Sequence, residues 1–157
     1  MVRVNEDGSQ QQKTVPDPVI FFQNLSPDGK WIVVRVGVTQ EETSSALLAY
    51  PAGGGSPQRI CNDCSVKWSP DGKLLYFWLV GTMNVTPEAK KTYVVALRPG
   101  MSLPPLPAAG IKSLAELTRL PAAGAINMQN IYPGPSVGVY AFTKSSVHNN
   151  LYRIPVP

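Results

Sequence analysis

The sequence predicts an all-β fold that is built from repeated units of four antiparallel strands. A five-residue phrase, SPDGK, occurs at residues 26–30 and again at residues 69–73, an offset of 43 residues. Each copy precedes an apolar run with high strand propensity, WIVVRVGV at 31–38 and LLYFWLV at 74–80. The 16 prolines and 13 glycines lie between apolar runs, as expected for many short strands joined by turns. A repeat of about 40–45 residues with four strands per unit is typical of β-propeller blades.

The repeated phrase has the composition of a tight turn. Proline presets φ at the first central position, aspartate is accepted at the second, and glycine takes the positive φ that follows. We therefore assign structural roles to both copies, in preference to metal binding or acid catalysis. The turn residues are Ser26, Pro27, Asp28, Gly29, Ser69, Pro70, Asp71 and Gly72.

The first complete unit is expected over residues 17–62. Its first two strands flank the first SPDGK turn, a polar loop at 39–45 follows, and a glycine turn at 53–55 joins the last two strands. The expected strands are residues 21–25, 31–38, 46–50 and 58–61.

The second unit, over residues 63–122, follows the same plan but contains an insertion at 99–121. Its first three strands are expected at 65–68, 74–80 and 92–97. Two interpretations of the insertion remain open. Ser113 and Glu116 have the spacing of a capping box, and apolar residues recur on one helical face, so a short helix at 114–120 is one interpretation. The other interpretation makes residues 116–120 the outer strand of the unit.

Partial units are expected at both ends of the chain. Residues 1–16 resemble the third and fourth strands of a preceding blade, around a turn at 6–9. Residues 123–157 form a degenerate unit, with an inner strand at 126–131 and further strands at 137–142 and 151–157. The chain is thus predicted to be a single partial propeller domain of about three and a half blades, an incomplete ring.

Alternation along residues 74–80 predicts which side chains share a face. Tyr76 and Trp78 point to one side of the strand, whereas Leu75, Phe77 and Leu79 point to the other. Because all five are large and apolar, both faces are expected to be buried between neighbouring sheets.

The blade phrases resemble those of the TolB-type, WD-repeat-like propeller family. The resemblance is carried by NLSPDGKWIVV at 24–34, by KWSPDGKLLYF at 67–77 and by AYPAGGGSPQRI at 49–60. It covers most of the chain, strongly for two units and weakly for the third. It implies a protein-binding scaffold, a sensor domain fused to a bacterial kinase or regulator, or the non-catalytic propeller of a prolyl-peptidase-type enzyme. Complete members close a ring of about six blades, so this chain resembles a C-terminal or middle piece of a larger propeller.

Cys61 and Cys64 are the two cysteines of the chain, in a single CxxC motif. A structural zinc site requires a second ligand pair, and a thioredoxin-like site requires a helix after the motif, so neither is expected. A disulfide across the loop and a pair of reduced thiols both remain open. The disulfide would favour a bacterial periplasmic or other extracytoplasmic location, and reduced thiols would favour the cytoplasm.

Composition and motifs exclude several functional classes. The sequence contains a single histidine and no glycine-rich loop ending in G-K-[ST], so we expect neither enzymatic activity nor a cofactor. The net charge is +4, but Lys90 and Lys91 are the only adjacent basic residues, which argues against nucleic-acid binding. No apolar run is long enough for membrane insertion.

Two functional hypotheses follow. The first is a non-enzymatic scaffold that binds a protein or peptide partner through loops at 39–45, 81–91 and 145–150. The second is an accessory propeller of a Ser/Thr kinase or prolyl-peptidase-type hydrolase whose catalytic domain lies outside this chain. An incomplete ring exposes an apolar face and a strand edge, so self-association that completes the propeller is also expected. The candidate partner-binding residues are Glu41, Glu42, Lys90, Lys91 and His148.

Overall fold

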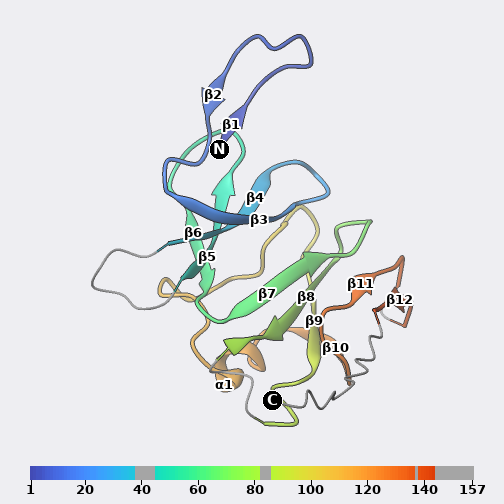
Figure 1. Cartoon of the computed structure of the whole chain (residues 1–157). Coiled ribbons are helices and arrows are strands. Elements are labelled where there is room, and N and C mark those ends of the chain that lie inside the picture. The colour runs from blue at the N-terminus through green and yellow to red at the C-terminus, as the bar shows by residue number, and fades with distance from the viewer. Residues whose placement is uncertain (38–44, 82–85, 137, 144–157) are drawn as a thin grey trace, which may run out of the picture.

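The computed structural model, which describes residues 1–37, 45–81, 86–136 and 138–143, is mostly β (Figure 1). The described residues form two four-stranded antiparallel sheets and two two-stranded sheets. One short helix lies in the insertion of the second unit.

The first four-stranded sheet is a meander in which consecutive strands are neighbours, in the order β3-β4-β5-β6. It contains all four strands that the sequence predicts for the first unit. Its strands are β3 (Val19–Leu25), β4 (Trp31–Val36), β5 (Ala46–Pro51) and β6 (Gln58–Cys61). Residues 38–44, which include most of the expected binding loop at 39–45, lie outside the described residues.

The second four-stranded sheet repeats this meander in the order β7-β8-β9-β10. Its first three strands lie where the repeat predicts them, and the fourth follows the insertion. The strands are β7 (Cys64–Trp68), β8 (Leu74–Leu79), β9 (Thr92–Ala96) and β10 (Ala122–Ile126).

The insertion forms a helix, α1 (Leu114–Leu117), so the alternative outer strand at 116–120 is wrong. The backbone N–H of Glu116 donates to Ser113 Oγ over 3.3 Å, and the N–H of Lys112 donates to Glu116 Oε2 over 2.7 Å. These two bonds satisfy amide groups at the start of the helix, and Leu117 is buried beneath it. The helix ends at Leu117, and the chain joins the edge of the second sheet only at β10.

The inner strand expected at 126–131 is not formed. Ile126 is the last residue of β10, which pairs with β9, and residues 127–131 are irregular. The expected boundary between 122 and 123 consequently falls within a strand of the second sheet. Ala122–Ile126 (AAGAI) consists mostly of alanine and glycine, whose strand propensity is low, so the pattern did not mark this segment as a strand.

The two sheets pack face to face, and the alternation expected for β8 is observed. Leu75, Phe77 and Leu79 belong to the cluster between the sheets, together with residues of β4 and β5 such as Val33 and Leu47. Tyr76 lies on the opposite face of β8, in a cluster with Ile126 and Ile131. The second sheet is thus covered on both faces, which explains why its central strand is almost uniformly apolar.

A two-stranded hairpin precedes the first sheet and another follows the second (Figure 1). The first hairpin lies within residues 1–16, where the sequence predicts two strands around a turn at 6–9, and the expected strand at 151–157 lies outside the described residues. No helix among the described residues is long and apolar enough to cross a bilayer. The hairpin strands are β1 (Val2–Arg3), β2 (Gln12–Lys13), β11 (Tyr132–Pro133) and β12 (Tyr140–Ala141).

Candidate functional site

The two SPDGK turns have the same internal hydrogen bonds. In the first, Ser26 Oγ–H donates to Asp28 Oδ1 over 2.6 Å, and the Lys30 N–H donates to the same oxygen over 3.1 Å. In the second, Ser69 Oγ–H and the Lys73 N–H donate to Asp71 Oδ1 over the same two distances.

Glycine closes each turn in the left-handed region. Gly29 and Gly72 both have φ of 71°, and their N–H groups donate to the carbonyl groups of Ser26 and Ser69. Oδ1 of each aspartate therefore accepts its hydrogen bonds from groups of its own turn.

The environments of the two aspartates differ in one respect. Ser102, in the loop after β9, donates its hydroxyl hydrogen to Asp28 Oδ2 over 2.6 Å. The hydrogen bonds from Ser102 and then Ser26 hold the pKa of the Asp28 carboxyl far below its ordinary value. The pKa of Asp71 is also lowered, mainly by the hydrogen bond from Ser69 and then by Lys73, two residues of its own turn.

The turns of the two sheets form opposite walls of a cleft of about 610 Å³, and the loop at 97–102 lies beside them. This volume is within the range of small-ligand and peptide-side-chain pockets. We call it the turn cleft. It is lined by Pro27, Asp28, Lys30, Trp68, Pro70, Asp71, Gly72, Lys73, Leu97, Arg98, Pro99, Gly100, Met101 and Ser102.

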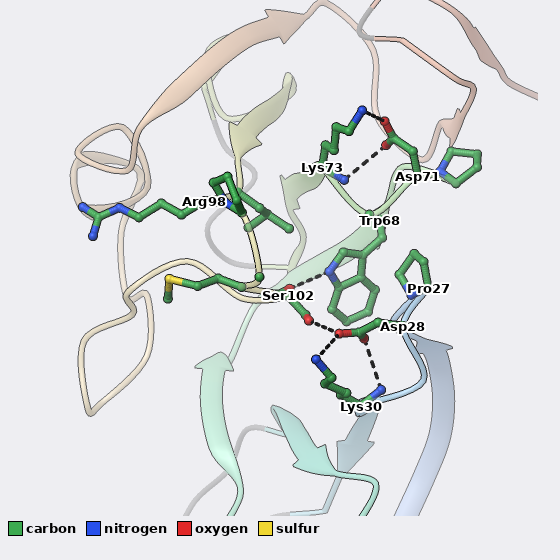
Figure 2. Close-up of a pocket in the computed structure, with 14 residues that line it drawn as sticks. Pro27, Asp28, Lys30, Trp68, Asp71, Lys73, Arg98 and Ser102 are labelled. Carbon is green, nitrogen blue, oxygen red and sulfur yellow. Dashed lines mark hydrogen bonds and ion pairs between the residues drawn. The ribbon is translucent and has the colours of Figure 1, made fainter.

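Figure 2 shows Trp68 at the centre of the turn cleft, with Lys30 and Lys73 on either side of it. The indole N–H of Trp68 donates to the Ser102 carbonyl oxygen over 2.6 Å, which fixes both the ring and the loop. The ammonium groups lie 3.5 Å (Lys30) and 3.4 Å (Lys73) from the aspartate of their own turn. Both lysine side chains are largely exposed, so these ion pairs contribute little to stability and leave the ammonium groups accessible.

A second groove of about 490 Å³ lies along the first strands of the two sheets. Lys67 of β7 lines it, with its ammonium group 3.6 Å from the centroid of the Tyr132 ring and 3.1 Å from the Ile131 carbonyl oxygen. Partial burial lowers the pKa of Lys67. These contacts join β7 to the residues at the start of β11, so we assign Lys67 a structural role.

The loop between Cys61 and Cys64 joins the two four-stranded sheets. Cys61 and Cys64 form a disulfide, and both residues are buried. The guanidinium group of Arg35, in β4, donates to the carbonyl oxygens of Asn62 and Cys64 over 2.7 and 2.6 Å. Desolvation lowers the pKa of Arg35. The disulfide is thus a covalent cross-link at the junction between β6 and β7.

The residues expected to bind a partner lie away from the turn cleft or outside the described residues. Lys90 and Lys91 line a separate hollow with Pro87 and Asn127, at the opposite end of β8 from the SPDGK turn. Residues 41, 42 and 148 are not described. No group of His, Cys, Asp and Glu side chains among the described residues is arranged to hold a metal ion.

Sequence patterns identified the two turns that form the walls of the turn cleft but not the loop at 97–102 that lies beside them. The SPDGK turns were identified, but as structural elements only. Met101 and Ser102 lie in the insertion and Arg98 directly precedes it, and the only signal there was that the insertion departs from the repeat. Comparison of the chain with models of protein families, with curated proteins and with solved structures finds no match.

Proposed function

We propose that this chain is a non-enzymatic β-propeller segment that binds an extended protein or peptide segment in the turn cleft. The observation that carries the proposal is the cleft itself, which is formed by equivalent turns of two consecutive four-stranded meanders. The same repeat that builds the scaffold therefore also builds the site.

The packing of the first strands supports the propeller architecture. β7 contacts both β3 and β11, so the first strand of each unit lies beside the first strand of the next. The Asn24 side-chain amide donates to the Val66 carbonyl oxygen over 2.7 Å, and Lys67 donates to the Ile131 carbonyl oxygen over 3.1 Å. Adjacent inner strands that are joined in chain order are what a radial array of blades requires.

The walls of the turn cleft are held rigidly. Each turn is closed by its own hydrogen bonds, and Ser102 joins the first turn to the loop after β9. Loops that are positioned by a rigid scaffold lose little conformational entropy when a partner binds. This rigidity favours the interpretation of the turn cleft as a binding site rather than as a hinge between the sheets.

The lining defines the kind of ligand that would fit. Pro27, Pro70 and Met101 are exposed apolar groups, and they would contact an apolar or aromatic side chain. Lys30 and Lys73 present ammonium groups on either side, which would pair with a carboxylate. The favoured ligand is therefore an extended peptide that carries an apolar side chain next to an acidic one.

The test is a selection of displayed random peptides against the full chain, followed by titration of the selected peptides. We expect the peptides to combine apolar and acidic residues and to bind at least about fivefold more weakly to a Lys73→Glu variant, the loss of about 1 kcal/mol expected for one favourable charge contact that is reversed. A Lys112→Glu variant has the same change in net charge at an exposed position outside the cleft and serves as the control.

Equal binding to the Lys73→Glu and Lys112→Glu variants would show that the peptides do not occupy the turn cleft. Failure to select any peptide that competes with others for one site would count against the proposed function as a whole.

A further inference from the structure

The groove beside Lys67 is a separate cavity, which shares no lining residue with the turn cleft. Its volume of about 490 Å³ is within the range of small-ligand sites. Its walls come from β3, β7, β8 and the segment between β10 and β11. We call it the lysine groove. It is lined by Phe21, Gln23, Ser65, Lys67, Trp78, Val80, Gln129 and Asn130.

The ammonium group of Lys67 carries a charge that no carboxylate of the described residues balances. Its neighbours are the Ile131 carbonyl oxygen at 3.1 Å and the rings of Tyr132 and Trp78, whose centroids lie 3.6 and 5.4 Å away. These groups attract a cation but bear no formal negative charge. Desolvation alone accounts for the lowered pKa of Lys67, and the lining of the groove contains no aspartate or glutamate.

Two neutral hydrogen-bond donors lie beside Lys67. Ser65 precedes it by two residues in β7, and Trp78 of β8 is the direct partner of Ser65 across the strands. Strand alternation therefore places the three side chains on one face of the second sheet. Trp78 is only 6% exposed, and neither its indole N–H nor the Ser65 hydroxyl group forms a hydrogen bond with a described residue. A ligand with acceptor oxygens would satisfy both groups.

Side-chain amides hold the other walls of the lysine groove in place. Gln23 of β3 donates to the Val66 carbonyl oxygen over 3.2 Å. Gln129 donates to the carbonyl oxygens of Leu79 and Ala89 over 2.9 Å in each case. The groove is thus formed before any ligand enters it, which lowers the entropic cost of binding.

The remaining lining is apolar. Phe21 is 49% exposed, and Val80 is partly buried after the end of β8. We propose that the lysine groove binds a carboxylate that is attached to an apolar or aromatic group. The carboxylate would accept hydrogen bonds from Lys67, Ser65 and Trp78, and the apolar group would contact Phe21 and Val80.

The charge of the lysine groove selects the kind of anion. Lys67 is the one ionisable side chain among the described residues that line it, so the groove offers a single positive charge. A carboxylate carries one negative charge, whereas a phosphate monoester carries nearly two at neutral pH. Charge balance therefore favours a carboxylate. This site does not rest on the proposed function of the turn cleft.

The experiment follows the indole N–H signal of Trp78 by NMR in isotope-labelled full chain, after a Trp78→Phe variant has identified the signal. Phenylacetate is the probe, and phenylacetamide, which has nearly the same shape but no charge, is the matched control. We expect phenylacetate to shift the signal saturably. Phenylacetamide should bind about tenfold more weakly, because neutral hydrogen bonds replace charge-assisted ones.

Three variants test the residues of the site. Lys67→Met should weaken phenylacetate binding about tenfold, because it removes the charge. Ser65→Ala removes a hydroxyl group that has no partner among the described residues, so it should leave the fold intact and weaken binding about threefold. Lys73→Met removes a charge from the turn cleft instead and should leave phenylacetate binding unchanged.

The tripeptide glycyl-glycyl-phenylalanine distinguishes two sources of the carboxylate. Tighter binding than phenylacetate would identify a peptide C-terminus as the occupant, and weaker binding would identify a free organic acid. Either result supports the site.

Equal binding of phenylacetate and phenylacetamide would overturn the proposal, as would the absence of a saturable shift. Equal losses in the Lys67→Met and Lys73→Met variants would also overturn it, because the acid would then occupy the turn cleft. If Lys67→Met does not fold, the amide control and Ser65→Ala still decide the outcome. Failure of the lysine groove to bind the acid, with peptide binding retained in the turn cleft, would leave the proposed function intact.

Discussion

The hydroxyl group of Ser102 donates a hydrogen bond to the Asp28 carboxylate over 2.6 Å, across 74 residues of sequence. Asp28 already accepts hydrogen bonds from Ser26 and from the backbone of Lys30. Ser102 thus converts the carboxylate of a local turn into a link between the two four-stranded sheets. Trp68 holds the same loop through the carbonyl oxygen of Ser102.

Replacement of Ser102 by alanine should remove this link while the turn itself remains closed. We expect the free energy of unfolding to fall by about 1 kcal/mol, the usual net value of a hydrogen bond to a partly exposed charged group. Urea denaturation followed by tryptophan fluorescence would measure the change. Ser56→Ala, at an exposed position outside the turn cleft, should have almost no effect. Equal effects of the two substitutions would contradict a special role for Ser102.

Acid should destabilise the protein through Asp28. Ser102, and then Ser26, hold the folded-state pKa of Asp28 below its unfolded value. A carboxyl with a depressed folded-state pKa contributes stability above its unfolded pKa of about 4, and this contribution is lost as the pH falls below that value. Urea midpoints measured at decreasing pH should therefore fall, and the Ser102→Ala variant should show a shallower decline. Parallel declines in the two proteins would show that Ser102 does not set the pKa of Asp28.

The turn glycines should be intolerant of a side chain for a reason of backbone geometry. Gly29 and Gly72 have φ of 71°, and no atom lies within 4 Å of a Cβ built on Gly29. Alanine at position 29 should therefore cost about 1–2 kcal/mol from left-handed strain alone. Gly53→Ala, which has similar open space without a positive φ, should change stability little. A neutral Gly29→Ala variant would mean that the turn can adopt another conformation.

Reduction of the Cys61–Cys64 disulfide should weaken the protein modestly. The cross-link closes a loop with a sequence separation of 3, and the chain-entropy model assigns such a short loop about 2 kcal/mol. Thermal unfolding with and without dithiothreitol would measure the loss. A Cys61→Ala/Cys64→Ala double variant should unfold at lower temperature and show no further response to the reductant. A response in the double variant would show that the reductant acts on something other than the Cys61–Cys64 disulfide.

Most strands of the two four-stranded sheets could be predicted because their signals are local. The SPDGK phrase determines a turn from hydrogen bonds closed within a few residues, and the runs after each copy are apolar on both faces. β10 could not be predicted in this way. Its small residues carry little strand signal, and the insertion with the capped helix separates it from its partner β9 in the sequence.

The candidate site was less predictable than the fold. The sequence identified the turn residues but assigned them structural roles only, and it placed partner binding in other loops. The turn cleft arises when two turns 43 residues apart and a loop of the insertion come together. No periodicity marks Ser102 as a partner of Asp28, because their contact is determined by the packing of one sheet on the other.

The sequence by itself determined the repeat, the two tight turns and the alternating burial of β8, because turn conformation and strand alternation depend on neighbouring residues. Only the tertiary structure decided where β10 lies and which loop completes the turn cleft. These features depend on contacts between segments far apart in the chain, where the free energy comes from sheet packing rather than from local conformational preference.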